Sequence, residues 1–175
     1  MKNLSSSGGF KIYMNDCRIM AGCEILGVDE FIILDSTGKA GGDILNYKDG
    51  YTLPTNAVEI GCSFRINNGD ATNQASTIHD NCNIVRINGT YADVTGQCVA
   101  DIGAGAAWML GCTFENSDGG DGYGVYSGLP EMWLDTCVSV DNAVDLRSEL
   151  EATIFYIHDF TGGGTNDIAG TLTEY

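Results

Sequence analysis

The side chains that could perform acid–base chemistry are two histidines and a large set of carboxylates. His79 is followed directly by Asp80, and Asp101 and Asp121 lie further along the middle of the chain. Two carboxylates at a suitable separation can hydrolyse a glycosidic bond. Among 24 acidic residues some pair lies close by chance, and the sequence identifies no partner for His79. If the protein is an enzyme, His79, Asp80, Asp101 and Asp121 are the residues to test, but we expect no catalytic site.

A glycine-rich segment offers a weak candidate for a calcium site. Residues 117–123 read Ser-Asp-Gly-Gly-Asp-Gly-Tyr, in which Asp118 and Asp121 supply hard oxygen donors. The segment lacks the spaced third donor and the terminal glutamate of an EF-hand, so a glycine-rich corner is the simpler interpretation. Tyr123 and Tyr126 flank the segment and are our candidates for contact with a sugar ring. We expect no metal and no cofactor.

Composition narrows the classes of partner. The chain has 175 residues, of which 43% are hydrophobic, and this suits one folded domain. Its eight basic and 24 acidic residues give a net charge of −16, which opposes binding to nucleic acid and to anionic membranes. No stretch reaches the roughly 18 apolar residues of a membrane span, and the first residues lack the apolar run of a signal peptide. The 24 glycines with only two prolines indicate many tight turns.

The elements that would position these residues follow from a repeat. Six segments align on a position occupied by Cys17, Cys62, Cys82, Cys112, Cys137 and His158. Large apolar residues stand four positions earlier, at Tyr13, Val58, Ile78, Trp108, Trp133 and Ile154. Two positions later stand Ile19, Phe64, Ile84, Phe114, Ser139 and Phe160. Even offsets on one side are typical of a strand with one buried face. We therefore expect all three columns to point inward, with His79 pointing outward and the cysteines reduced and stacked with His158.

The repeat spacing predicts a solenoid. Placing a missing unit at Thr37 gives six intervals over 141 residues, an average of 23.5. Asparagine and glycine follow the aligned position in several units, and these residues suit sharp corners. A leucine ladder and sustained helical spacing are both lacking, which disfavours leucine-rich and helical repeats. The sequence predicts an all-β fold, a single-stranded parallel β-helix of about seven coils.

The pattern apolar-x-x-x-Cys/Asn-x-apolar-x-Asn-Asn-Gly resembles the pectate-lyase-like superfamily of right-handed parallel β-helices. The resemblance covers roughly residues 10–172, so it implies an N-terminal arm over 1–9 and a β-helix domain over 10–175. This superfamily includes polysaccharide lyases, polygalacturonases and bacteriophage tailspikes. No Arg-x-Lys and no Asp-Asp pair of its enzymes occurs in this chain.

Two classes of function remain. The first is a structural or interaction module without a catalytic site, since strand edges at the ends of a β-helix need covering. The resemblance then implies a component of a phage virion, either a capsid decoration protein or part of a spike or fibre. It would be assembled in the host cytoplasm as a homo-oligomer, most simply a trimer, with its N-terminal arm packed on a neighbour or on other virion proteins. The alternative is a carbohydrate-binding or polysaccharide-degrading β-helix, with Tyr123 and Tyr126 as glycan contacts.

Overall fold

A computed structural model describes most of the chain. The described residues are 11–19, 23–26, 30–40, 45–48, 55–66, 75–80, 82–93, 96–116, 122–148 and 150–175. The expected N-terminal arm over 1–9 and the calcium candidates Asp118 and Asp121 lie outside them. Within the described ranges the chain forms strands and turns and no helix, so no helix there is long and apolar enough to cross a membrane.

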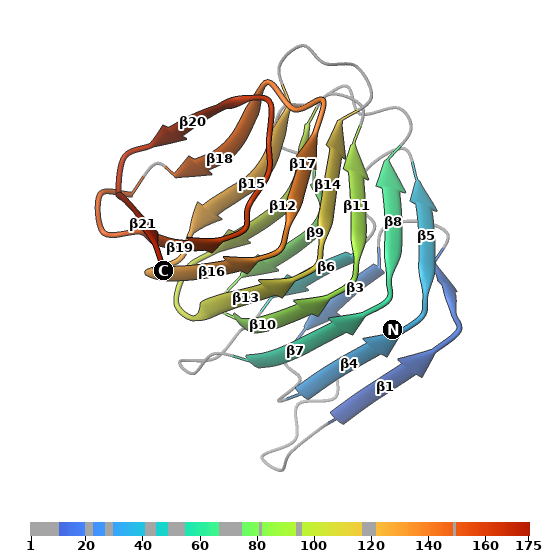
Figure 1. The fold of residues 1–175 in the computed structure, drawn as a ribbon. Helices are drawn as coiled ribbons and strands as arrows, with labels where there is room; N and C mark the ends of the chain where they lie inside the picture. Colours follow the sequence, from blue (N-terminus) through green and yellow to red (C-terminus); the bar gives the residue numbers. More distant parts are fainter. Residues whose placement is uncertain are drawn as a thin grey trace.

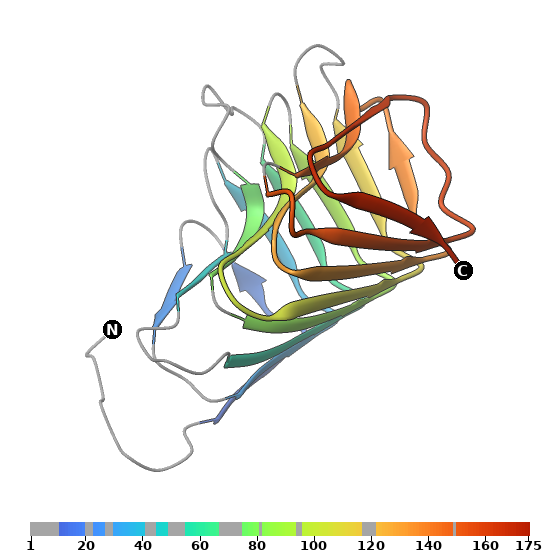
Figure 2. The ribbon, with the colours of Figure 1, turned by 90° about the vertical axis from the view of Figure 1, so that its left-hand side faces the viewer.

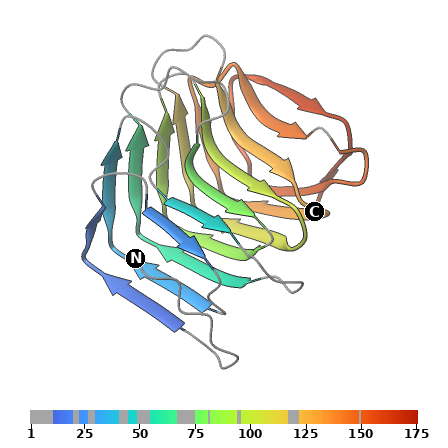
Figure 3. The same ribbon diagram turned by 180° about the vertical axis from the view of Figure 1, so that it is seen from behind.

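The strands form three parallel sheets that wind into a solenoid (Figure 1). Sheet A stacks β1 (Lys11–Asn15), β4 (Glu30–Leu34), β7 (Thr55–Ile60), β10 (Cys82–Ile87), β13 (Ala106–Leu110), β16 (Glu131–Asp135), β19 (Ile154–His158) and β21 (Thr171–Glu174). Sheet B stacks β2 (Arg18–Ile19), β5 (Thr37–Ala40), β8 (Ser63–Ile66), β11 (Thr90–Asp93), β14 (Thr113–Asn116) and β17 (Val138–Val140). Sheet C, seen from behind in Figure 3, stacks β3 (Cys23–Leu26), β6 (Leu45–Lys48), β9 (Ala75–Asp80), β12 (Gln97–Ile102), β15 (Tyr123–Gly128), β18 (Val144–Ser148) and β20 (Thr165–Ile168).

Each pass of the chain visits the sheets in the order A, B, C. Six passes supply a strand to every sheet, and β19, β20 and β21 continue the same course. Consecutive passes lie side by side, so the coils stack along one axis in chain order, from β1 to β21 (Figures 1 and 2). The prediction of an all-β parallel β-helix is confirmed.

A left-handed residue turns the chain from sheet A into sheet B. The corner positions stack on one another, with φ between 45° and 63°, at Asp16, Asp35, Gly61, Asn88, Gly111, Thr136 and Asp159. Each of the first six donates its backbone N–H to the last sheet A residue of the next coil, as Gly61 does to Ile87 at 2.9 Å. Asparagine, aspartate and glycine tolerate this conformation, which explains why they occupy most of the corner positions.

The corner reverses the alternation of inward and outward side chains. The prediction that the column four positions before the aligned position points inward is therefore wrong. Tyr13, Trp108 and Trp133 lie four residues before the aligned position, on the far side of the corner residue. They point out of the solenoid: Tyr13 is 63% exposed, Trp108 is 42% exposed and Trp133 is half-buried. The inward residues of sheet A are their neighbours, such as Met109 and Met132. A strand alternates with period two only while its backbone stays extended.

The stacked column after the corner also differs from the expected one. Cys17, Cys62, Cys112 and Cys137 do stack there, and all four thiols are free. The other members of the column are Ser36, Gly89 and Phe160, shown by backbone hydrogen bonds from Ser63 to Ser36 and from Thr113 to Gly89 and by the bridge between Val138 and Thr161. Phe160 was expected two positions later in its coil. The expected members fall elsewhere. Cys82 is buried at the start of β10, Thr37 is the exposed neighbour of Ser36, and His158 is exposed at the end of β19.

The column two residues after the corner forms the core behind sheet B. Ile19, Phe64, Tyr91, Phe114 and Ser139 are all buried there, and their strands are in register. The ring centroids of Tyr91 and Phe114 lie 6.0 Å apart in a stacked arrangement. The prediction that this column points inward is confirmed for Ile19, Phe64, Phe114 and Ser139. Ile84 is also buried, but it belongs to sheet A.

Candidate functional site

A cluster of charged side chains lies inside the solenoid. Sheet A contributes Glu59 from β7 and Arg86 from β10, and sheet C contributes His79 from β9 and Asp101 from β12. All four are at most 1% exposed. They occupy inward positions of strands that otherwise bury apolar residues, and they come from two consecutive coils. The cluster therefore fills the space between sheets A and C with polar atoms.

Arg86 is the centre of this cluster. Its Nη1 and Nη2 donate to the two carboxylate oxygens of Asp101 at 2.7 and 2.8 Å, and its Nε lies 3.3 Å from Glu59 Oε2. Nη2 also donates to Thr77 Oγ1 at 3.2 Å. The Tyr91 hydroxyl donates to Glu59 Oε2 at 2.6 Å. A guanidinium that holds a carboxylate with two parallel hydrogen bonds is the strongest common form of ion pair.

His79 contacts the other three charged members of the cluster. Its Nδ1 lies 2.6 Å from Arg86 Nη2 and 3.1 Å from Asp101 Oδ1. Its Nε2 lies 3.3 Å from Glu59 Oε1. His79 thus lies between the arginine and the carboxylates of β7 and β12.

The paired charges shift the acidity of the carboxyl groups. Burial on its own raises the pKa of Asp101, but the charge and hydrogen bonds of Arg86, helped by His79, lower it to about 2. Burial likewise opposes ionisation of Glu59, and Arg86 with His79 still holds its pKa below the usual range. Both groups are therefore carboxylates at neutral pH, and the cluster is an ionised network in a dry interior.

The cluster includes two of the residues that the sequence offered for acid–base chemistry. His79 and Asp101 meet there, with His79 Nδ1 3.1 Å from Asp101 Oδ1. The prediction that His79 points outward is wrong, since it shares the inward face of β9 with Thr77. Both side chains are sealed from solvent, so a polymeric substrate has no access to them. Asp80 is half-buried on the outer side of sheet C, and Asp121 lies outside the described residues.

Arg86 and Glu59 were missed by the sequence analysis. A signal for Arg86 is present in β10, where Cys82, Ile84 and Arg86 alternate with outward residues. Read with period two, this strand places an arginine on the buried face. The alignment placed Cys82 and Ile84 on the inward side but was not extended by two residues to Arg86.

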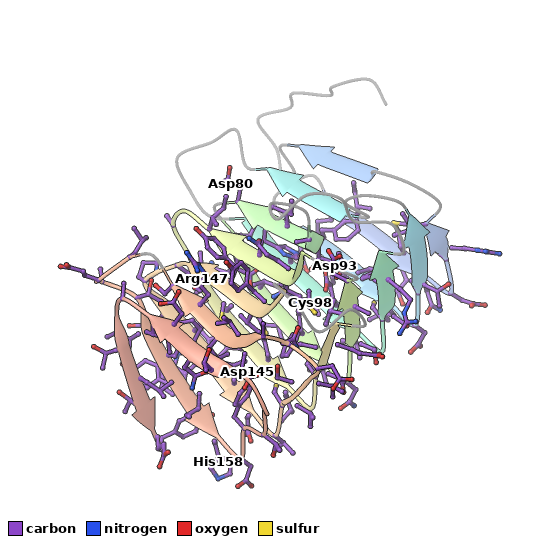
Figure 4. All side chains as sticks on the ribbon, turned by 90° about the horizontal axis from the view of Figure 1, so that it is seen from above. Asp80, Asp93, Cys98, Asp145, Arg147 and His158 are labelled. Atoms are coloured by element: carbon purple, nitrogen blue, oxygen red, sulfur yellow. The ribbon has the colours of Figure 1, made fainter. Side chains whose placement is uncertain are left out.

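The tyrosine candidates lie on the outer side of sheet C. Tyr123 and Tyr126 are both half-buried. The Arg147 guanidinium lies 4.8 Å from the centroid of the Tyr123 ring, and Arg147 also pairs with Asp167 at 2.8 Å. One face of the Tyr123 ring is therefore covered by a cation–π contact. Figure 4 shows Arg147 and Asp80 away from His158, which belongs to sheet A.

The outer side of sheet A carries an apolar surface, which we call the A face. Its central column runs in register through Tyr13, Ile32, Val58, Val85, Trp108, Trp133, Tyr156 and Thr173. The column beside it begins Asn15, Leu34, Ile60, Ile87 and Leu110 and continues with Asp135 and His158. Apart from Thr173 the central column is entirely apolar or aromatic. Exposed apolar patches of this kind are common at interaction sites.

The aromatic part of the A face is packed ring against ring. Trp133 and Tyr156 stack with centroids 3.9 Å apart, and Tyr175 meets Trp133 edge-on at 5.3 Å. Trp133 and Tyr156 therefore each have one ring face covered by the other. Beside them His158 Nδ1 lies 2.9 Å from Asp135 Oδ1, and this pair forms the polar margin of the surface.

The chain matches no family model, no curated protein and no solved structure. The parallel β-helix is established by the strand ladders of the chain itself. The A face and the buried cluster are features that the β-helix fold itself does not require, and they are therefore the basis for a functional proposal.

Proposed function

We propose that this protein is a structural interaction module that assembles with copies of itself through the A face. The observation that carries the proposal is the pair of adjacent apolar columns on sheet A. Trp108 and Leu110 are 42% and 46% exposed, and Tyr13 is 63% exposed. Burying such side chains against a partner gains about 25 cal/mol for each Å² of apolar surface removed from water.

The character of the A face favours a protein partner over a glycan. Sugar rings stack on the open faces of aromatic side chains and need hydrogen-bonding groups beside them. The rings of Trp133 and Tyr156 are stacked on each other, and the strands before Trp108 carry aliphatic residues on this surface, as at Val58, Ile60 and Val85. The alternative, a carbohydrate-active β-helix, is further disfavoured by the burial of His79 and Asp101.

The setting proposed for this module is a virus particle. Its repeat resembles that of the pectate-lyase-like superfamily, whose members include phage tailspikes. A rigid rod with an apolar flank suits a capsid decoration protein or part of a spike or fibre. In such a setting the acidic remainder of the surface keeps the chain soluble before assembly.

The test is the mass of the protein in solution. We expect the wild-type chain to sediment as an oligomer at micromolar concentration and Trp108→Lys to sediment as a monomer. The matched control is Val138→Lys, which adds the same charge at a similarly exposed apolar residue (38%) on sheet B and should keep the oligomer. A wild-type monomer, or equal loss of the oligomer in both variants, would overturn the proposal.

A further inference from the structure

We propose that two copies pair A face to A face with their solenoid axes antiparallel, which makes a two-fold dimer. This inference rests on the proposed function, since it concerns the same surface. It replaces the expected trimer by a symmetry that the charge and the side-chain sizes of this chain favour. The symmetry axis would run along the strands, between β10 and β13, which are the two middle strands of sheet A.

Charge is distributed unevenly along the solenoid axis. Residues 1–105, through the end of the coil that begins with β10, hold seven basic and 12 acidic residues, a net charge of −5. Residues 106–175 hold one basic and 12 acidic residues, a net charge of −11. Because the coils stack in chain order (Figure 2), the end that contains β21 is the more acidic one. At that end the described exposed carboxylates include Glu151, Asp159 and Glu174, whereas Lys11 and Arg18 are exposed at the other.

An antiparallel pair separates the two acidic ends. Packed sheets lie about 10 Å apart, which is close to the Debye length at physiological salt. Eight strands at about 4.8 Å spacing make a stack roughly 34 Å long. Charges in the two halves of one stack are therefore screened from each other more strongly than charges that face each other across the interface. Parallel copies, in a dimer or around a three-fold axis, would set each −11 half against another. Antiparallel copies would place each half with a net charge of −11 opposite a half with a net charge of −5, which carries most of the basic residues.

Side-chain size leads to the same arrangement. In the central column of the A face, three of the four residues before the symmetry axis are aliphatic (Ile32, Val58 and Val85), and three of the four after it are large aromatics (Trp108, Trp133 and Tyr156). Antiparallel pairing places Val85 opposite Trp108, Val58 opposite Trp133 and Ile32 opposite Tyr156. Alternation of large and small residues across an interface fills space, whereas parallel pairing would set tryptophan against tryptophan and leave a gap at the valines.

The repeat and the area also suit a second copy as the occupant. Rows of side chains on the A face recur at the strand spacing, and a second copy has the same spacing over its full length. The whole outer side of sheet A, which also includes a column that contains Lys11, Glu30, Asn56 and Glu131, is about 34 Å long and five residues wide, at about 3.3 Å per residue, and covers roughly 550 Å² on each copy. The total of about 1,100 Å² passes the size of about 1,000 Å² that separates specific interfaces from incidental contacts.

Cross-linking between cysteine variants tests the orientation. Val58→Cys and Trp133→Cys are prepared in the full chain and treated with a short homobifunctional maleimide, alone and mixed in equal amounts. We expect a cross-linked dimer in the mixture and little from either variant alone, since residue 58 of one copy faces residue 133 of the other. Wild-type protein is the control for the native thiols, and the Val58→Thr variant is the control for a polar change at the interface.

The possible outcomes distinguish an error in the antiparallel orientation from an error in the choice of the A face as the interface. Cross-linking of Val58→Cys with itself, or an oligomer mass of three chains, would overturn the antiparallel dimer and leave assembly through the A face intact. Absence of any cross-link in an oligomeric sample would place the interface on another surface and overturn both proposals. A monomeric wild-type chain would also overturn both. A dimer mass together with cross-linking in the mixture alone would support both.

Discussion

Arg86 and Asp101 hold each other by two hydrogen bonds, at 2.7 and 2.8 Å, across the interior of a single coil. Arg86 comes from sheet A and Asp101 from sheet C, and both side chains are fully buried. Glu59 and His79 extend the pair into the preceding coil. Such a network gives little net stability relative to an apolar core. Removing one member, however, leaves the other charges buried without a partner, which is costly.

Arg86→Met should therefore be strongly destabilising. It leaves Asp101 and Glu59 buried without their cation, and we expect a loss of about 3–5 kcal/mol in the free energy of unfolding. Urea denaturation followed by circular dichroism measures it. The control is Arg65→Met, which breaks the exposed pair with Glu115 (3.0 Å) and should cost about 0–1 kcal/mol. Equal effects of the two variants would show that the interior network does not hold the coils together.

Stability should fall in acid because of Asp101. Its pKa in the folded chain is about 2, below the ordinary value of 3.8, so ionised Asp101 stabilises the fold above pH 4. This contribution is lost as the pH falls from about 4 to 2 and amounts to roughly 2–3 kcal/mol. Asp101→Asn should be less stable than wild type at pH 6 and should show a flatter dependence between pH 4 and 2. Unfolding free energies at a series of pH values check this, and parallel curves for the two proteins would contradict it.

The corner between sheets A and B contains one residue that suits it poorly. Thr136 is β-branched and adopts φ of 53°, where most corner residues are glycine, asparagine or aspartate. Thr136→Asn should raise stability by about 0.5–1 kcal/mol, because asparagine tolerates the left-handed conformation. The reverse change at an equivalent corner, Asn88→Thr, should lower stability by a similar amount. Thermal unfolding of the two variants measures both, and a shift of the same sign in each would refute the explanation.

The aromatic stack behind sheet B should be sensitive to the loss of one ring. Phe114 is fully buried and stacks on Tyr91, so Phe114→Ala should cost about 3–5 kcal/mol. Cys62→Ala removes a single buried sulfur from the column beside it and should cost about 1 kcal/mol. Chemical denaturation distinguishes the two. A cost for Cys62→Ala as large as that for Phe114→Ala would imply a role for the thiol beyond packing.

The sequence was sufficient to predict the solenoid because the corners repeat. Cys17, Cys62, Cys112 and Cys137 each follow a left-handed corner residue, and the residue two positions later is buried in all four coils and apolar in three of them. Side-chain direction across the corner was not predictable from spacing alone. One residue with positive φ reverses the alternation, and this is why Trp108 was assigned to the core. His79 was assigned to the surface because its direction was counted from Cys82, which belongs to the next strand, β10. Cys82 and His158 fitted the spacing by chance and shifted the register of two coils.

The interior cluster was hidden for a different physical reason. Charged residues are expected on the surface unless their partners are known. The carboxylate partners of Arg86 come from other strands, with Glu59 27 residues before it and Asp101 15 residues after it. Only the winding of the chain brings them together. The A face was hidden by the same error of direction that placed its tryptophans inside.

In a solenoid each coil contacts only its neighbours, so unfolding starts at the ends and advances one coil at a time. The network of Glu59, His79, Arg86 and Asp101 connects two adjacent coils in the middle of the stack. Fraying from either end should therefore stall there, and the amides of β7, β9, β10 and β12 should exchange with solvent more slowly than those of β19 and β21. The chain would then behave under mechanical load as two extensible segments joined by a stiff central block.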